Sequence, residues 1–543
     1  MKKQFALLSF IAISTMAQTL TQKIDVTVVN VDVVVTAPDG TPVRGLSRDD
    51  FQLFEDGVPQ PITNFYSVGT SPATVQATTA AAPPAPAPSN DDPRFRRKVL
   101  VLIDNVHISK HARDMALDQL EKFIDDRFRG GEYDWSIATV GSRLGLIMPL
   151  TSDKQRIHET IAAIRRGGAR QDATESLKLS DVSPAMRHGM DQVPSNGRAQ
   201  FSPDLFSYGQ QEHEREIRAR FTVDAVVSAA RALAAADGKK IVLLLSDNRD
   251  FNDIELTYSK KGYFIQRDFI SDKQTDNFGT ISREIKTLKD YIVAEANASN
   301  VSFYIIDPEG LKAPADLGLP DDPGGTSGMT NSQGLFWLAA DTGGRLMPGN
   351  DLNASMMQFE TRSSNFYSLG FHPSHDDAKY HKLTVKLTKP GKYDLRYRTG
   401  YSNVTSEEQL ERTLRSPLAM SAHASSLPVT LLTEKAEPQK RGTVLVPFRA
   451  TIPISKLQFL PDGQKWNATF DVYVSVFDVD GNNLSFNRFS SSATAPSGTV
   501  NPAAKFTYRN GVVMRTGPHR IVVAFRDRAT DAVGVAESMV QTE

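Results

Sequence analysis

Two aspartates stand directly after apolar runs that have the character of buried strands. Asp104 ends the run that begins at Val99, and Asp247 follows Ser246 at the end of a second run. The carboxyl ends of parallel strands meet at one edge of a sheet, and ligands of open α/β sheets bind there. Carboxylate oxygens are the ligands that hard divalent cations prefer. The two aspartates could therefore converge on a divalent cation at this edge, with capping of two helix N-termini as their alternative role.

Two histidines close to Asp104 could serve a different cation. His107 and His111 are four residues apart at the expected start of a helix, so together with Asp104 they could ligate Zn²⁺. The metalloprotease pattern His-Glu-x-x-His is absent from this stretch, because Ile108 stands where the glutamate belongs. We therefore interpret the two histidines as solvated residues on the first helical turn.

An alternation of strands and helices between residues 98 and 350 must position these side chains. Continuous apolar runs at 99–103, 241–245 and 301–306 are typical of strands buried on both faces of a parallel sheet. Stretches of helical periodicity lie between the runs. The pattern predicts a central α/β doubly wound, Rossmann-like domain. Alternating β-branched residues before and after it predict flanking β domains, the last of them an antiparallel β-sandwich.

Changes in residue composition and apolar pattern divide the sequence into consecutive segments. We expect a signal peptide over 1–17, a small N-terminal β unit over 22–68, an Ala/Pro-rich linker over 69–97, the central domain over 98–350 with an insertion over 165–220, a β extension over 351–401, a linker over 402–424 and the β-sandwich over 425–543.

The first residues have the layout of a cleavable export signal. Lys2 and Lys3 precede an apolar run from Phe5 to Met16, which is shorter than the roughly 20 apolar residues of a membrane-spanning helix. We expect a soluble protein that is exported to the periplasm or the extracellular space, with no integral membrane segment after cleavage of the signal. The chain contains 0 cysteines, which excludes disulfides and thiol catalysis.

Composition and missing motifs exclude several classes of function. The 543 residues carry 62 Lys and Arg against 63 Asp and Glu, a net charge of -1, whereas a dedicated nucleic-acid-binding protein is normally basic. Neither a Gly-x-Ser-x-Gly nucleophile elbow nor a Gly-x-x-x-x-Gly-Lys phosphate loop is present. We therefore expect no enzymatic activity and no nucleic-acid partner.

The order of several short motifs adds a resemblance to a known family. Residues 45–51 read GLSRDDF, 54–57 read FEDG, 367–371 read YSLGF and 397–401 read YRTGY. In this order, and with the strand–Asp, helix and strand–Ser-Asp succession between them, they resemble the acidobacterial von Willebrand factor A (VWA)-related exported proteins. The resemblance covers about residues 1–401 and implies a von Willebrand factor A-like fold for the central domain.

The resemblance also implies a metal-ion-dependent adhesion site. In the von Willebrand factor A domain an Asp-x-Ser-x-Ser loop, a Thr and a later Asp hold Mg²⁺, and a carboxylate of the partner completes the shell. The matching positions here are Asp104, Ser109 (one residue beyond the expected serine), Thr174 and Asp247. Val106 and Ile108 occupy the two serine positions and offer no side-chain oxygen, so we expect the site to be degenerate.

Three functions follow as hypotheses. The first is an exported adhesion or scaffold protein that binds a protein ligand, with Mg²⁺ as the only implied cofactor. The alternative is a metal-independent structural or interaction protein of the cell envelope, which binds through the 165–220 insertion or the β domains. The third is a hydrolase built on Asp104, His107 and His111, which the missing catalytic motifs disfavour.

Overall fold

A computed structural model describes most of the chain. It covers residues 28–69, 74–77, 96–127, 132–141, 144–166, 222–246, 288–308, 335–418 without 376 and 378, 427–462, 465–478, 483–495, and 501–542 without 502. The expected signal peptide, nearly all of the 165–220 insertion, Thr174 and Asp247 lie outside these residues.

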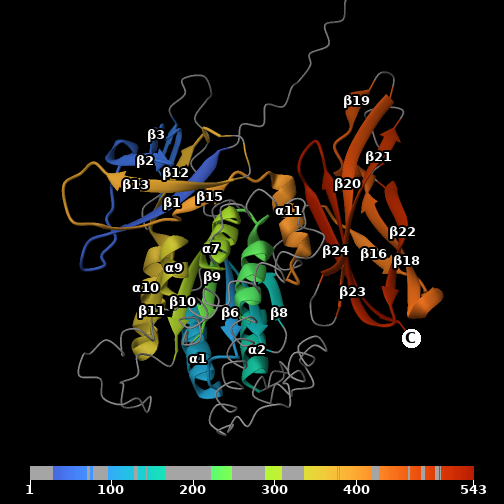
Figure 1. Ribbon diagram of the computed structural model, residues 1–543, viewed down its shortest axis with the longest axis horizontal. Coiled ribbons are helices and arrows are strands. Elements are labelled where there is room, and N and C mark those ends of the chain that lie inside the picture. The colour runs from blue at the N-terminus through green and yellow to red at the C-terminus, as the bar shows by residue number, and fades with distance from the viewer. Residues whose placement is uncertain are drawn as a thin grey trace, which may run out of the picture.

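The described chain is built mainly of β-structure (Figure 1). Strands make up 49% of it and helices 27%, and the strands are divided among several sheets. The predicted fold class, α/β doubly wound with a Rossmann-like and von Willebrand factor A-like core, is therefore wrong. The alternation of strands and helices that suggested it is confined to the surroundings of one sheet. Local periodicity reveals the strands and helices of this stretch. It does not reveal the other sheets, because they pair segments that are distant in the sequence.

Six strands form the sheet that carries Asp104. They are β6 (Arg97–Asp104), β7 (Tyr133–Val140), β8 (Leu144–Thr151), β9 (Lys239–Leu245), β10 (Val301–Asp307) and β11 (Arg345–Pro348). Their order is β11-β10-β9-β6-β7-β8. All neighbouring pairs are parallel except β7 and β8.

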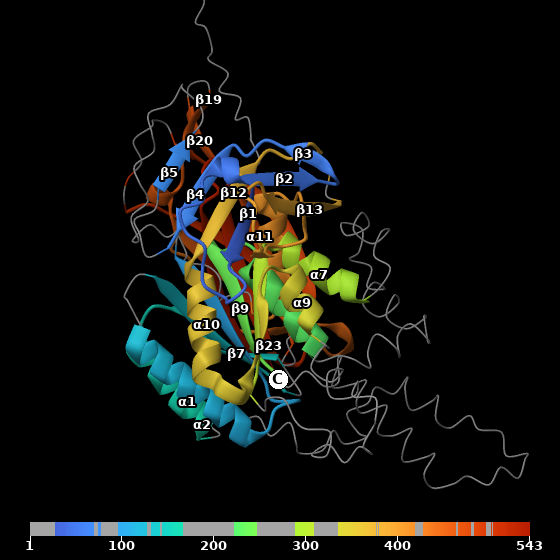
Figure 2. The ribbon, with the colours of Figure 1, turned by 90° about the vertical axis from the view of Figure 1, so that its left-hand side faces the viewer.

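Helices cover both faces of this sheet (Figure 2). One face carries α1 (Lys110–Arg127), α2 (Lys154–Arg165) and α10 (Leu352–Ser364); the other carries the helix over 222–233, α7 (Leu288–Ala298) and α9 (Phe336–Asp341). Successive residues of β6 enter different cores: Val101 packs with α1, and Leu102 with the helix over 222–233. Every residue of β6 is therefore buried. None of the helices in the described ranges combines the length and apolar character needed to cross a bilayer.

Two further sheets pair strands from distant parts of the chain. They contain β1 (Val29–Thr36), β2 (Phe51–Glu55), β3 (Val58–Gln60), β4 (Asn64–Val68), β5 (Thr74–Ala77), β12 (Phe366–Phe371), β13 (Tyr380–Leu387), β14 (Asp394–Arg396) and β15 (Gly400–Ser402). Their orders are β14-β1-β12-β4-β5 and β15-β13-β2-β3. The rings of Phe51 and Tyr367 lie 5.2 Å apart in the core that the two sheets share. The early and late β segments thus form one packed unit.

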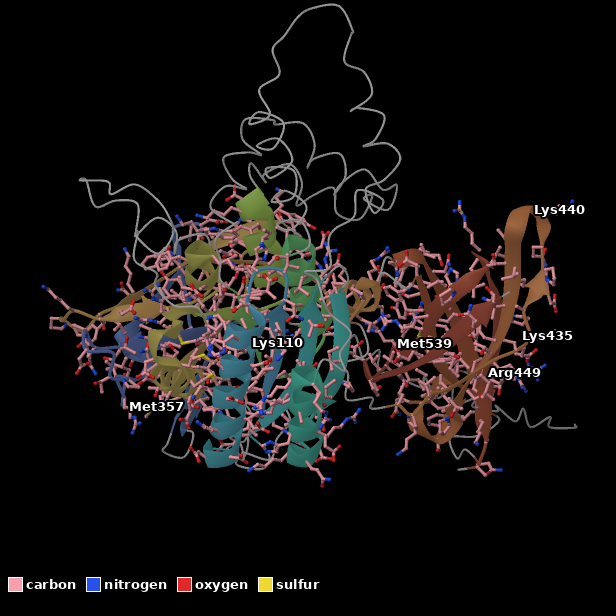
Figure 3. The ribbon with its side chains drawn as sticks, turned by 90° about the horizontal axis from the view of Figure 1, so that it is seen from below. Lys110, Met357, Lys435, Lys440, Arg449 and Met539 are labelled. Atoms are coloured by element: carbon pink, nitrogen blue, oxygen red, sulfur yellow. The ribbon has the colours of Figure 1, made fainter. Side chains whose placement is uncertain are left out.

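The C-terminal unit consists of antiparallel strands in two sheets. They are β16 (Thr430–Thr433), β17 (Glu437–Pro438), β18 (Thr443–Pro453), β19 (Leu460–Asp462), β20 (Lys465–Phe477), β21 (Asn483–Ala495), β22 (Lys505–Arg515), β23 (Gly517–Asp527) and β24 (Val533–Thr542). Phe448 from one sheet and Phe470 from the other join the same core. Figure 3 shows Lys435, Lys440 and Arg449 on the outside of this unit.

One helix, α11 (Ser406–Arg415), lies between the C-terminal unit and the rest of the chain (Figure 1). It begins with a capping box, in which Thr405 Oγ1 accepts a hydrogen bond from the Glu408 N–H at 3.2 Å. Leu410 and Leu414 pack against strands β20 and β23. On its other side, Arg412 reaches Glu295 of α7 at 3.1 Å. The helix therefore contacts both units through different faces.

Candidate functional site

Asp104 is the last residue of β6 and lies at the carboxyl edge of the six-stranded sheet. Strands β6 and β9 run parallel with Ile103 opposite Leu245, so the residues that follow, Asp104 and Ser246, emerge beside each other. The helical residues 222–233 bring Thr222 to the same point. The topology thus surrounds one fully buried carboxylate with three separate elements.

Four groups contact the Asp104 carboxylate. Its Oδ2 accepts hydrogen bonds from Ser246 Oγ at 2.8 Å and from Thr222 Oγ1 at 3.1 Å. The Nδ1 of His107 lies 2.9 Å from the same oxygen, and it must be the donor because a carboxylate only accepts. The Oδ1 accepts the Val106 N–H at 3.1 Å. Both oxygens are therefore bonded within the protein.

The surroundings of Asp104 favour its ionised form. Burial opposes a charge and would by itself raise the pKa of the carboxyl. The charge and the hydrogen bond of His107, followed by the hydroxyls of Ser246 and Thr222, outweigh burial and lower the pKa of Asp104 below its ordinary value. Asp104 is thus a carboxylate at neutral pH, and its partner His107 has a side chain that is only 4% exposed.

Among the residues that the structure describes, the groups around Asp104 do not form an oxygen shell of the kind that Mg²⁺ requires. This ion requires a near-octahedral set of oxygen ligands. Here the imidazole of His107 takes the position next to Oδ2, and Val106 turns its N–H toward the other oxygen. Ile108 packs in the apolar core on the α1 face of the sheet. The imidazole of His107 therefore contacts the carboxylate oxygen that the predicted cation would bind.

Asp104, His107 and Ser246 are the residue types of a hydrolytic triad, but their connection differs. In a triad, histidine lies between the acid and the nucleophile and accepts the proton of the hydroxyl. Here the aspartate is in the middle, because the Ser246 hydroxyl donates to Asp104 and not to histidine. Ser246 is also fully buried. The arrangement therefore joins the ends of β6 and β9 through the Asp104 carboxylate, and it differs from the order of groups in a hydrolytic triad.

The other residues predicted for this site lie apart from Asp104 or outside the described chain. Ser109 Oγ accepts the Ala112 N–H at 3.2 Å, which places it at the start of α1. His111 is exposed on the first turn of that helix, unlike the buried side chain of His107. Thr174 and Asp247 lie in ranges that the structure does not describe. Thr222 and Ser246 supply the hydroxyls instead.

A second group of ionisable side chains lies at the turn between β2 and β3. Asp56 and Gly57 have φ angles of 49° and 86°, as in a tight hairpin turn with two left-handed residues. Strand β13 pairs with β2, and Leu383 lies opposite Glu55. This register brings His381 to the turn, where its Nδ1 lies 2.8 Å from Asp56 Oδ2.

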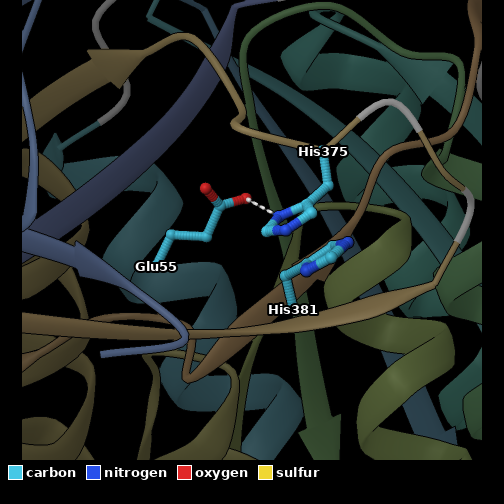
Figure 4. Close-up of side chains that lie close together, drawn as sticks. All are labelled: Glu55, His375 and His381. Atoms are coloured by element: carbon cyan, nitrogen blue, oxygen red, sulfur yellow. Dashed lines mark ion pairs between the residues drawn. The ribbon is translucent and has the colours of Figure 1, made fainter. Parts of the chain in front are cut away.

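Glu55 and two histidines meet beside this turn (Figure 4). Glu55 Oε1 accepts the Tyr401 hydroxyl at 2.5 Å and lies 3.8 Å from His375 Nδ1. The rings of His375 and His381 are stacked, with centroids 4.9 Å apart. The Nε2 of His381 lies 2.8 Å from Asp377 Oδ1. A single histidine is thus held between two carboxylates, with a second histidine on its face.

The charges at this turn follow from these contacts. Burial would raise the pKa of Glu55, but hydrogen bonds from Tyr401 and Ser374 lower it below its ordinary value. Burial would lower the pKa of His381, but its hydrogen bonds to Asp56 and Asp377 raise it. Sequence analysis missed this group, and the only local signal was the FEDG turn at 54–57.

Comparisons with known proteins add little at this level of similarity. No family model and no curated protein matches the sequence. Among solved structures, BatB from Bacteroides thetaiotaomicron, a conserved hypothetical protein, is 11% identical with a TM-score of 0.23, and the match covers 49% of this chain and 98% of that one. A related hit is an aerotolerance-related membrane protein from Bacteroides fragilis, with the same identity and TM-score.

A longer match involves the pilus adhesin SpaC from Lactobacillus rhamnosus GG. It is 9% identical with a TM-score of 0.25, covers 88% of this chain and spans 58% of the adhesin. The chain spans only 13% of beta-glucuronidase 2 from Bacteroides uniformis, at 11% identity and a TM-score of 0.15.

Proposed function

We propose that the chain is an exported, metal-independent protein-binding scaffold of the cell envelope, and not an enzyme. The observation that carries this proposal is the closed arrangement at Asp104. The carboxylate that would hold a cation or act on a substrate is buried and bonded to His107, Thr222 and Ser246. A protein partner would therefore meet the surface of the chain directly, without a bridging metal ion.

The link through α11 supports a scaffold role. Glu295 of α7, which is 1% exposed, bonds Arg231 Nε at 2.9 Å and Arg412 Nη1 at 3.1 Å. The Thr413 hydroxyl donates to the Arg231 carbonyl at 2.9 Å. A buried charge is costly to leave without its partner, so this network holds α11 in place between the two units. Surfaces on both units would then face a partner in a fixed arrangement.

We further propose that the chain belongs to the acidobacterial von Willebrand factor A-related exported proteins. Two of the motifs behind that resemblance meet in space. Glu55 of the FEDG motif accepts a hydrogen bond from the hydroxyl of Tyr401, the last residue of the YRTGY motif. Among sequences that carry both motifs, residues at these two positions should vary together, and independent variation would count against a shared family.

The test of binding compares one partner with and without divalent cations. The mature chain is immobilised, envelope proteins of the source organism are passed over it, and a retained protein is purified. We expect its Kd for the chain to agree within about twofold with and without added Mg²⁺ in chelator-free buffer, which leaves any other bound metal in place. A Kd weakened about tenfold or more when Mg²⁺ is left out would contradict independence of Mg²⁺ at Asp104. If the folded chain retains no protein that the unfolded chain does not also retain, a binding function is contradicted.

A further inference from the structure

We propose that Glu55, His375 and His381 form a Zn²⁺-binding site that fastens the loop between β12 and β13 to the turn between β2 and β3. Each of these residues offers one ligand atom, and the ligand atoms all lie within 4.8 Å of one another. Figure 4 shows the carboxylate of Glu55 directed toward the stacked imidazoles. The three residues come from two strands and a loop, so a shared ion would join elements that are distant in the sequence.

The distances suit a small tetrahedral ion. With Zn²⁺ bonds of about 2.0–2.1 Å, two ligand atoms of a tetrahedral site lie about 3.3 Å apart. Glu55 Oε1 and His375 Nδ1 are 3.8 Å apart, so they need to approach by about half an ångström. The other pairs of ligand atoms lie within 4.8 Å and need to approach by at most about 1.5 Å. The side chain of His375 is 53% exposed, which leaves it room to make this movement.

Glu55 is the fixed ligand of the set. It is 1% exposed, and its Oε2 accepts hydrogen bonds from Gln60 Nε2 at 2.9 Å and from the Ser374 N–H at 3.0 Å. Its Oε1 accepts one hydrogen bond, from Tyr401, and a carboxylate oxygen has a second lone pair. These partners orient the carboxylate before any ion arrives, as outer hydrogen bonds do at metal sites.

His381 has the support that metal-bound histidines require. One ring nitrogen contacts Asp56 and the other contacts Asp377, each at 2.8 Å. When one nitrogen releases its proton to solvent and binds the ion, the carboxylate on the other nitrogen still holds the ring. The carboxylate that loses its hydrogen bond is then adjacent to the ion and can supply a fourth ligand.

Charge and ligand type favour Zn²⁺ over harder cations. Three carboxylates, those of Glu55, Asp56 and Asp377, surround the two imidazoles, so the site attracts a divalent ion. Imidazole nitrogens suit zinc and other late transition metals, whereas Mg²⁺ and Ca²⁺ prefer a shell of oxygens alone. Two histidines with one carboxylate is a ligand set that zinc adopts in proteins.

Calorimetric titration of ZnCl₂ into the tag-free, EDTA-treated and dialysed full chain tests the site. We expect one equivalent to bind tightly, and His375→Ala and His381→Ala each to weaken binding about 100-fold. Asp56→Asn and Asp377→Asn should weaken it about 10–100-fold. Replacing Zn²⁺ by Co²⁺ should give the visible absorption of a tetrahedral site, which His375→Ala should abolish. Because His375 is exposed, its substitution leaves the fold intact, and circular dichroism verifies this.

His158 offers a matched control. It also lies between two carboxylates, with Nδ1 2.8 Å from Glu121 and Nε2 3.2 Å from Asp125, but it is on α2 and outside the group. His158→Ala should bind Zn²⁺ like the unchanged chain. The proposal is overturned if Zn²⁺ does not bind, if neither His375→Ala nor His381→Ala weakens binding, or if His158→Ala weakens it equally.

Discussion

Replacing His107 by alanine tests whether the imidazole stabilises the Asp104 carboxylate in place of a cation. The change removes the donor 2.9 Å from Oδ2 and leaves the donors from Ser246, Thr222 and the Val106 N–H. A hydrogen bond to a charged group contributes about 1.5–3 kcal/mol, and removing one partner of a buried ion pair costs about 3–5 kcal/mol. Because three donors remain, we expect the free energy of unfolding of the surrounding unit to fall by about 3 kcal/mol.

Urea unfolding followed by tryptophan fluorescence measures this loss. Trp135 of β7 is 2% exposed and lies in the core between the sheet and α1, so it reports on the unit that contains Asp104. His111→Ala is the matched control, because His111 is exposed on the first turn of α1. We expect the control to change the free energy of unfolding by no more than about 0.5 kcal/mol. Mg²⁺ should not change the free energy of unfolding of the unmodified chain.

The pH dependence follows from the lowered pKa of Asp104. A carboxyl whose pKa is lower in the folded state stabilises that state above its unfolded pKa, and this contribution is lost as the pH falls through the folded value. The difference between the unchanged chain and His107→Ala should therefore shrink in acid. A loss below about 1 kcal/mol at neutral pH, or one equal to that of His111→Ala, would refute the role assigned to His107.

Four other substitutions test three features away from this site. Burial lowers the pKa of Lys240 to about 7 from 10.5. Between these pH values only the unfolded chain holds the proton, so the stability of the folded chain rises with pH. Lys240→Met should remove that rise, measured as Tm against pH, and an unchanged rise would contradict the lowered pKa. A Cβ on Gly344 would lie 1.8 Å from the Phe303 carbonyl oxygen, so Gly344→Ala should cost about 3 kcal/mol or more in urea unfolding. Gly40 has a φ of +85° and no atom within 4 Å of an added Cβ, so Gly40→Ala should lower the free energy of unfolding by only about 1–2 kcal/mol. Equal losses for the two glycine variants would refute the clash with Phe303. Glu295→Gln should lower the free energy of unfolding by about 3–5 kcal/mol, because it leaves Arg231 and Arg412 without their buried carboxylate. It should also speed tryptic cleavage near α11, and unchanged cleavage would argue that this network does not hold α11.

The strands around Asp104 could be predicted because their signal is local. A strand covered on both faces needs a continuous apolar run, and the runs at 99–103, 241–245 and 301–306 coincide with β6, β9 and β10. The fold class could not be predicted in the same way. Pairing of β1 with β12 and of β2 with β13 joins segments hundreds of residues apart, and no period within either segment specifies its partner.

The candidate site was predictable to a similar extent. The position of Asp104 at a strand end follows from the sequence, but Thr222 lies 118 residues further along, beyond a stretch without periodicity. The sequence offers His107 as a zinc ligand, and only the folded geometry shows that its Nδ1 donates a hydrogen bond to Asp104. The Glu55 group depends on the register between β2 and β13, which places His381 beside Asp56 across 325 residues.

The pairing of early with late strands sets the order in which the chain can fold. Leu46 donates its N–H to the Tyr367 hydroxyl, 321 residues later, and their surroundings form one core. At synthesis rates of about 5–20 residues per second, the first strands wait roughly 15–65 s for these partners. During that time β1 and β2 present unpaired edges with apolar faces, which are prone to aggregate. A nascent or partly exported chain thus needs protection by a chaperone until β12 and β13 have emerged, and termination before residue 366 would leave β1 without β12 and β2 without β13.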